Sequence, residues 1–314
     1  MQQQTLNRRE ILKWAGAAAG TSLMPRVVHS VPSNSAKASL TYCLNMATIR
    51  GHNLGFVKEL QTASKAGFRS VEIWMDSLQT YLDKGGTLQS ARKILSDLGI
   101  TVENTIGFAA WIVDDDAKRA KGIDQLKREM EMLAQIGCKR VAAPPMGATE
   151  GAALDLNRAA ERYRSILELG QKTGVVPHLE LWGFSKNLSK VSEVMYVAVE
   201  SDHPSARVLL DTYHIFKGGS SLDTLHMVST SAVELFHVND YSAKFERSVI
   251  TDADRIYPGD GVAPISRILK QFVSPQRPLI ISLEVFNKTY YSHDPLTVAK
   301  TALAKMKSST KGIS

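Results

Sequence analysis

The chain has 314 residues, of which 44% are hydrophobic and 22% are charged. This composition excludes a disordered chain, a collagen, a coiled coil and a disulfide scaffold, and it suffices for a large buried core. The net charge is +7, from 38 basic and 31 acidic side chains, and a net +3 of it lies before residue 37. The rest of the chain is only mildly basic and has no basic stripe with interleaved aromatics, so nucleic acid is not an expected partner. The two cysteines, Cys43 and Cys138, form neither a C-x-x-C nor a zinc pattern.

The first residues have the order of an export signal. Arg8 and Arg9 precede Lys13 and a weakly apolar run, 14–24, which is too short to span a bilayer. This order resembles a twin-arginine signal, in which a charged segment precedes a modest hydrophobic one. We therefore predict that residues 1–36 are a signal peptide and linker, and that the twin-arginine machinery exports the chain to the periplasm. No later stretch reaches 18 apolar residues, so we expect no stable membrane insertion of the mature chain.

From residue 39 onward, short apolar runs alternate with segments of helical periodicity. The runs are rich in Val, Ile, Leu and aromatics and end in polar, Gly or Pro residues, which is typical of buried strands. Eight strands are predicted, at Leu40–Met46, Ser70–Trp74, Thr101–Phe108, Arg140–Pro144, Val175–Trp182, Arg207–Asp211, Val233–Asp240 and Pro278–Phe286.

The segments between these runs favour helices. Apolar residues recur at helical spacing in Leu156–Gly170, and a glycine follows several such segments, where a helix C-terminus accepts a positive φ. Eight strand–helix pairs predict one α/β domain over residues 37–314, a (β/α)8 TIM barrel. The alternative, an open doubly wound sheet, needs a Gly-rich phosphate loop after its first strand, and residues 50–52 do not supply one.

In a barrel of this kind the active site lies at the C-terminal ends of the strands. Four predicted strands carry an ionisable side chain there, namely Glu180, Asp211, His237 and Glu284. A carboxylate buried alone is costly, and no Lys or Arg stands at these strand ends, so a divalent cation is the expected partner. Three carboxylates and one imidazole form a fairly hard donor set, which favours Mn²⁺ or Mg²⁺, although Co²⁺, Fe²⁺ and Zn²⁺ can also bind.

Four further residues are candidates for supporting roles. Trp111, after the third strand, is predicted to form an apolar wall over a substrate, although packing on the next helix explains it equally well. Glu72 is predicted to contact the substrate because strand interiors rarely hold a charge, with a structural carboxylate as the alternative. His178 shares a face with Glu180 one layer deeper, as expected of a hydrogen-bonded core histidine. Asp240 is expected to support a ligand rather than to bind the metal.

These strand ends resemble the xylose-isomerase-like barrel superfamily, specifically its sugar isomerase and epimerase branch. The resemblance covers essentially the whole chain after the linker. Its most specific motifs are Leu179-Glu180, Leu210-Asp211-Thr212-Tyr213-His214, His237-Val238-Asn239-Asp240, Pro258-Gly259-Asp260-Gly261 and Leu283-Glu284. It implies that Glu180, Asp211, His237 and Glu284 bind the metal and that His214 contacts the substrate. It also implies a substrate contact from a basic residue after the seventh strand; Arg247 is the favoured candidate, and Lys244 and Arg255 compete with it.

The resemblance further implies an enzyme that acts on a small sugar or keto-sugar. A metal that holds a carbonyl and a neighbouring hydroxyl oxygen acidifies the adjacent C–H by stabilising an enediolate. Glu180 and Glu284 lie on strands three apart, so one can remove the proton and the other deliver one. Delivery to the opposite face is epimerisation, and delivery to the neighbouring carbon is isomerisation. Loss of a β-hydroxyl or alkoxide is the alternative, a dehydratase or lyase reaction on a keto-sugar or 3-keto-glycoside.

Two other functional classes stay open, as does a homo-oligomer. An abasic-site endonuclease-like hydrolase shares this fold and half of the ligands, but it needs more strand histidines than this chain places there, and a basic DNA-binding face. An exported sugar-binding protein needs no chemistry, and the presence of both acid/base candidates, Glu180 and Glu284, argues against it.

Overall fold

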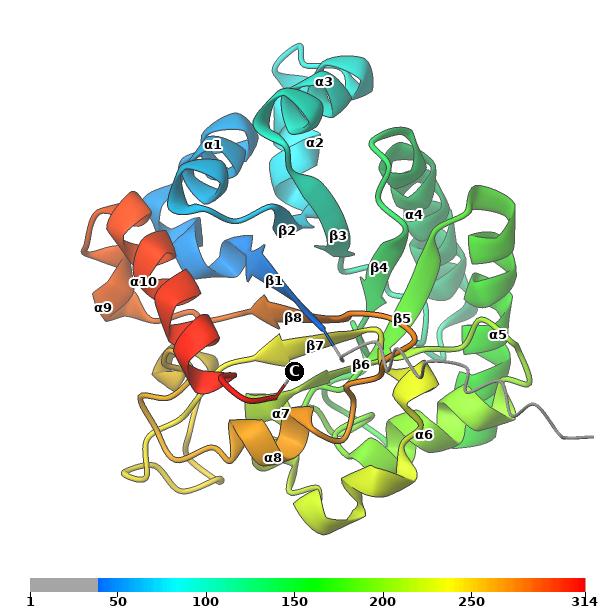
Figure 1. Ribbon diagram of the computed structural model, residues 1–314. Coiled ribbons are helices and arrows are strands. Elements are labelled where there is room, and N and C mark those ends of the chain that lie inside the picture. Colours follow the sequence, from blue (N-terminus) through cyan, green and yellow to red (C-terminus); the bar gives the residue numbers. More distant parts are fainter. Residues whose placement is uncertain (1–38, 314) are drawn as a thin grey trace, which may run out of the picture. The chain divides into compact units, whose positions relative to one another are not determined.

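The computed structural model describes residues 39–313, so the predicted signal peptide and linker lie outside the described residues. All eight predicted strands are present, each within its predicted range (Figure 1). They are β1 (Leu40–Asn45), β2 (Ser70–Trp74), β3 (Thr101–Ile106), β4 (Arg140–Ala143), β5 (Val176–Glu180), β6 (Val208–Asp211), β7 (Leu235–Val238) and β8 (Leu279–Leu283).

The strands form one parallel sheet that curves into a nearly closed barrel. Their hydrogen-bonded order is β3-β2-β1-β8-β7-β6-β5-β4, so the first strand pairs with the last. Strands β3 and β4 stand at the two ends of this order, and they contact each other in space, which nearly closes the barrel. The pairing of β1 with β8 is that of a barrel and not of an open doubly wound sheet. The predicted single-domain TIM barrel is therefore confirmed.

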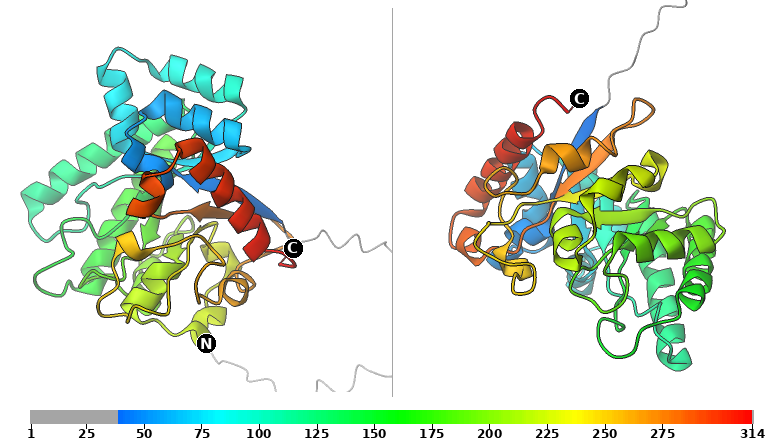
Figure 2. Two further views of the ribbon diagram at one scale, coloured as in Figure 1. Left: turned by 90° about the vertical axis from the view of Figure 1, so that its left-hand side faces the viewer. Right: turned by 90° about the horizontal axis from the view of Figure 1, so that it is seen from below.

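Helices follow the strands and lie around the outside of the barrel (Figures 1 and 2). The last of them, α10, returns along the chain's first strand to pack against α1 (Figure 2). Within residues 39–313, no helix is long and apolar enough to cross a membrane. The helices are α1 (Phe56–Ala66), α2 (Met75–Asp83), α3 (Leu88–Leu98), α4 (Asp116–Gln135), α5 (Leu156–Thr173), α6 (Val191–Glu200), α7 (Thr212–Gly218), α8 (Ile265–Leu269), α9 (Lys288–Tyr291) and α10 (Pro295–Ser309).

Helix α5 illustrates how the sequence builds one of these units. Asp155 caps its N-terminus by accepting a hydrogen bond from the Asn157 backbone N–H, and Gly174 ends it with a φ of +76°. Its apolar stripe is buried against the sheet. From this stripe the Tyr163 hydroxyl lies 2.8 Å from the Pro177 carbonyl oxygen and 2.7 Å from that of Arg207, which ties the helix to β5 and to the start of β6.

The interior of the barrel is layered, and this layering positions the site. A small apolar cluster fills the middle of the barrel, made of Cys43, Ile106, Ala142, Leu209, Leu235 and Ile280. The polar side chains of the predicted site lie further along the same faces of the strands: Asp211 and His237 are two residues beyond Leu209 and Leu235, and Glu284 is four residues beyond Ile280. His178 is fully buried, as predicted for a core histidine, but the predicted hydrogen bond is wrong, because neither ring nitrogen has a partner among the described residues. Burial lowers the pKa of His178 to about 3.

His178 predicts a specific acid sensitivity. Its imidazole is protonated more readily in the unfolded chain than in the barrel, so stability is full above the unfolded pKa of about 6.5 and falls as the pH drops toward 3. Between pH 7 and pH 5 this histidine should remove about 2 kcal/mol from the free energy of unfolding. In urea titrations, the free energy of unfolding of His178→Met should fall between pH 7 and pH 5 by about 2 kcal/mol less than that of the native chain. The control His226→Met, a change at an exposed residue, should show the same fall as the native chain. An unchanged pH dependence in His178→Met would refute this assignment.

Candidate metal centre

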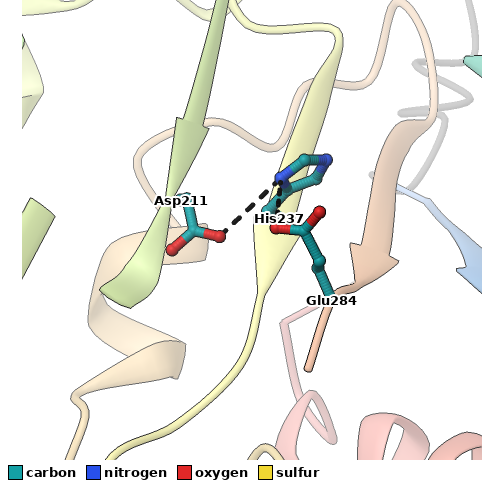
Figure 3. Close-up of side chains that lie close together, drawn as sticks. All are labelled: Asp211, His237 and Glu284. Atoms are coloured by element: carbon teal, nitrogen blue, oxygen red, sulfur yellow. Dashed lines mark ion pairs between the residues drawn. The ribbon is translucent and has the colours of Figure 1, made fainter. Parts of the chain in front are cut away.

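Four ionisable side chains from four neighbouring strands converge at the C-terminal rim. Glu180 ends β5, Asp211 ends β6 and is the register partner of His237 on β7, and Glu284 directly follows β8. The His237 Nδ1 atom lies 3.4 Å from Glu284 Oε2, 3.7 Å from Asp211 Oδ2 and 4.0 Å from Glu180 Oε1. Figure 3 shows this ring nitrogen directed at the carboxylates of Asp211 and Glu284. Of the four predicted metal-binding residues, which are all buried, Asp211, His237 and Glu284 bring one ligand atom each within 4.8 Å of one another. Glu180 lies at the edge of this group, 4.0 Å from His237.

The other ring nitrogen of His237 is held by Glu72. This nitrogen, Nε2, lies 2.9 Å from Glu72 Oε2. The same carboxylate accepts hydrogen bonds from three more side chains, those of Asn45 (2.8 Å), Asn104 (2.6 Å) and Ser282 (2.6 Å). Glu72 is fully buried beneath His237, so the predicted substrate contact is corrected: this residue acts on the site through the imidazole.

This arrangement fits a divalent cation. Burial lowers the pKa of His237, but the carboxylates of Glu72 and Glu284 outweigh it and raise this pKa well above its ordinary value. Without a metal, Nε2 therefore donates to Glu72 and Nδ1 also carries a proton that faces carboxylate oxygens, and a divalent cation would replace that proton. Among the described residues, neither His237 Nδ1 nor Glu180 Oε2 has a hydrogen-bond partner, although both are buried. A nitrogen buried among three carboxylates needs positive charge between them, which a proton supplies in the metal-free chain and a divalent cation would supply on binding. One nitrogen and three carboxylates are the donor set that the sequence predicted.

A buried arginine also reaches this cluster. Arg255 is 1% exposed, and its Nη1 atom lies 2.7 Å from Glu284 Oε2 and 3.2 Å from Asp211 Oδ2. Its Nη2 atom pairs with Asp252 and lies 3.1 Å from His214 Nε2. The strand ends carry no basic residue of their own, so the loop after β7 supplies one from a distance in sequence.

The favoured basic candidate, Arg247, does not lie at the site. It is exposed, and its guanidinium packs against Gly219. Arg255 takes that place because the loop folds back on itself: Asp240 and Ile256 exchange two backbone hydrogen bonds of 2.9 Å, which carries Arg255 to the rim. The choice of Arg247 is therefore corrected in favour of its competitor.

Asp240 holds this loop together rather than supporting a ligand. Its carboxylate accepts hydrogen bonds from the backbone N–H groups of Gly259 (2.9 Å), Gly261 (3.0 Å) and Ala263 (2.8 Å). A Cβ atom on Gly261 would lie 2.2 Å from the Tyr241 carbonyl oxygen, so the close approach requires glycine there. The Pro-Gly-Asp-Gly segment thus fixes the loop that bears Arg255.

The pKa values of Glu180 and Glu284 are shifted in opposite directions by their surroundings. Burial, the largest influence, raises the pKa of Glu180 to about 8. Burial acts in the same direction on Glu284, but the neighbouring His237 and Arg255 outweigh it and lower the pKa of Glu284 to about 2. Separated pKa values are typical of paired acid and base groups.

A cavity of about 390 Å³ opens above these residues. Glu180, Glu284, His214 and Arg255 line its floor, so His214 lies where a substrate contact was predicted. Trp111 does not reach the cavity: it is 1% exposed, donates a 2.9 Å hydrogen bond to the Pro144 carbonyl oxygen and packs on the ring of Tyr163. The apolar wall predicted for Trp111 is instead made by other aromatics, namely Trp74, Phe108, Trp182, Phe184 and Phe286.

Sequence reasoning missed the polar residues that support His237 and Asp211. Asn45, Asn104 and Ser282 bond Glu72, and Asn239 donates a 2.9 Å hydrogen bond to Asp211 Oδ2. A signal for one of them was present, because Ser282 lies two residues before Glu284 and so shares its face of β8. A polar residue at an inward position of a buried strand indicates an interior network.

The contact between Glu72 and His237 predicts a metal-affinity effect. Glu72→Gln can no longer fix the histidine tautomer with a charged acceptor, so we expect Mn²⁺ binding to weaken by roughly 10–100-fold in calorimetric titrations. Glu59→Gln is a matched control, since Glu59 is also buried but bonds Ser77 on the outer layer. Equal Kd values for the native chain and Glu72→Gln would contradict this role.

Arg255 and Arg247 predict opposite stability effects. In chelator-treated protein, Arg255→Ala leaves two buried carboxylates without their cation and should lower the free energy of unfolding by about 3–5 kcal/mol. Arg247→Ala removes an exposed side chain and should change it by less than about 0.5 kcal/mol. Urea denaturation of both variants distinguishes this arrangement from one in which Arg247 occupies the rim.

Comparison with known proteins gives this geometry a family. The chain is 26% identical to inosose isomerase of Halalkalibacterium halodurans over 265 residues, which cover 83% of this chain and 93% of that protein. It is 22% identical over 200 residues to 3-dehydro-D-guloside 4-epimerase of Escherichia coli, covering 59% and 71% of the two chains. A crystal structure of the IolI protein with a zinc atom superimposes with a TM-score of 0.79 at 21% identity, over 88% of this chain and 99% of that one.

A structure of D-psicose 3-epimerase with D-tagatose from Clostridium cellulolyticum superimposes with a TM-score of 0.69 at 18% identity, over 86% of this chain and 98% of that one. The family model described as xylose isomerase-like TIM barrel matches residues 60–309, and the chain belongs to that family.

Proposed function

We propose that this protein is a divalent-metal-dependent sugar isomerase or epimerase that moves a proton at a carbon next to a carbonyl. The observation that carries the proposal is the buried Nδ1 of His237, which faces three carboxylates, two of which, Glu180 and Glu284, line the cavity. The sugar isomerase and epimerase among its relatives support the reaction class. A small sugar or keto-sugar is the proposed substrate.

Glu180, Asp211, His237 and Glu284 would hold the ion. When bound, the ion would supply the positive charge that stabilises the negative charge of the substrate as its C–H proton departs. Mn²⁺ is the proposed ion because three carboxylates outnumber one nitrogen in the donor set. The zinc atom in the IolI structure supports a divalent ion at such a site. A comparison of Mn²⁺ and Zn²⁺ binding to this protein would distinguish the two ions.

The chain's own residues divide the proton transfer between two sides of the cavity. Glu180 on β5 presents Oε2 without a partner among the described residues, so this oxygen can take up the substrate proton while Oε1, which faces His237, would hold the ion. Glu284, after β8, is kept ionised by Arg255 and His237. One carboxyl group takes the proton from the substrate and the other returns one, and His214, which also lines the cavity, contacts the sugar between them. Arg255 holds the carboxylate of Glu284 in place.

Proton exchange tests this function directly. Metal-loaded protein incubated with keto-sugars in D₂O should replace one C–H by deuterium, as seen by NMR, and chelation should abolish the exchange until Mn²⁺ is restored. Glu180→Gln should lower the rate by roughly 10²–10⁴-fold, the usual contribution of a positioned acid or base. Glu131→Gln, an exposed change on α4, is the control. Exchange that survives chelation, or that survives in Glu180→Gln, contradicts the proposal.

We also propose twin-arginine export to the periplasm, which the Arg8-Arg9 sequence supports. Replacing both Arg8 and Arg9 by lysine keeps the positive charge but removes the arginine pair that the twin-arginine machinery would recognise. The double variant should therefore stay in the cytoplasm. Fractionation and immunoblotting measure this, with Lys13→Arg as a control that retains the pair. A double variant that still reaches the periplasm would refute twin-arginine transport.

A further inference from the structure

An arc of aromatic side chains continues the cavity outward from the carboxylates. Three of them stand two residues after a buried glutamate: Trp74 follows Glu72, Trp182 follows Glu180 and Phe286 follows Glu284. Trp74 shares the face of Glu72 on β2, while Trp182 and Phe286 lie just beyond the ends of β5 and β8 and line the cavity together with Glu180 and Glu284. Phe108, after β3, and Phe184, after β5, complete the arc. The rings therefore form a layer directly above the acidic layer.

The rings are continuous from one side of the cavity to the other. Ring centroids are 5.3 Å apart for Trp74 and Phe108, 6.3 Å for Phe108 and Trp182, and 5.2 Å for Trp182 and Phe184. The inner end is anchored, since Trp74 donates a 3.0 Å hydrogen bond to Asn45, which itself bonds Glu72. The outer end is open: Phe108 is 36% exposed and Phe184 is 42% exposed.

The charges around this arc are unsuited to a phosphate. Among the described residues that line the cavity, the cations are Arg255 and Lys288. Arg255 is already engaged by Asp211, Glu284 and Asp252, and Lys288 is exposed at the edge. A phosphorylated sugar would find no free cluster of donors there, whereas an uncharged planar group would find aromatic faces.

We propose that the substrate is a glycoside: a keto-sugar unit over the carboxylates, linked to a planar, apolar aglycone that stacks against Phe108, Trp182 and Phe184. This inference rests on the proposed function, because that function places the sugar unit on the cavity floor. A free monosaccharide would occupy the floor and leave the outer rings in water. An aryl group at the anomeric position covers the exposed faces of Phe108 and Phe184, which gives those side chains the role of selecting the substrate.

The test compares three probes that differ only at the anomeric position: free 3-keto-glucose, its methyl glycoside and its 4-nitrophenyl glycoside. Binding to the metal-loaded full chain is followed by the fluorescence of Trp74 and Trp182, and deuterium exchange is followed by NMR. We expect kcat/KM for exchange to be about tenfold higher for the nitrophenyl than for the methyl glycoside. Phe108→Ala and Phe184→Ala should each lower this ratio of kcat/KM values. Phe184→Leu should lower it as well, because leucine keeps the apolar volume but removes the aromatic face.

Phe245→Ala is the matched control, because Phe245 is 37% exposed but does not line the cavity. It should leave the ratio unchanged. Equal kcat/KM values for all three probes would overturn the aglycone site, and so would a ratio that Phe108→Ala and Phe184→Ala leave unchanged. In either case deuterium exchange would still support the proposed function. Preferential binding of the nitrophenyl probe without exchange would support the aglycone site and refute the proposed function. Failure of every probe to bind would overturn the inference.

Discussion

The site depends on one electrostatic constraint: three carboxylates and one imidazole share a buried space at the rim of the barrel. Removing ionised groups from water costs several kcal/mol each, so this cluster persists only with positive charge among its members. Arg255 supplies part of that charge to Asp211 and Glu284. The Nδ1 of His237 faces the three carboxylates, where a proton, or the divalent cation proposed above, would supply the rest.

The parallel register of the strands turns this constraint into a layered interior. An apolar cluster closes the middle of the barrel, a polar layer centred on Glu72 and His237 lies above it, and aromatic rings lie above the acids. Each layer arises from the two-residue repeat of a strand, so a change of register in one strand would move a charge into the apolar layer. Because Glu180 ends β5 and Glu284 follows β8, the two carboxylates line one cavity from different strands, as the proposed two-sided proton transfer requires.

The loop after β7 shows a different kind of determinant. Asp240 gathers three backbone N–H groups, and the pairing of Asp240 with Ile256 folds the loop so that Arg255 returns to the rim. These are local backbone hydrogen bonds within a long loop. They decide which of several basic residues meets the carboxylates, and they do so without any periodic pattern.

The sequence by itself determined the barrel and the four candidate ligands, because strand and helix periodicity and the position of a residue at a strand end are local properties. All eight strands and the convergence of Glu180, Asp211, His237 and Glu284 follow from them. The tertiary structure decided that Glu72 lies beneath His237, that Trp111 belongs to the core, and that Arg255 rather than Arg247 enters the site. Those outcomes depend on contacts between segments far apart in the chain and on how one loop folds back. The local spacing of residues along the sequence does not determine either of them.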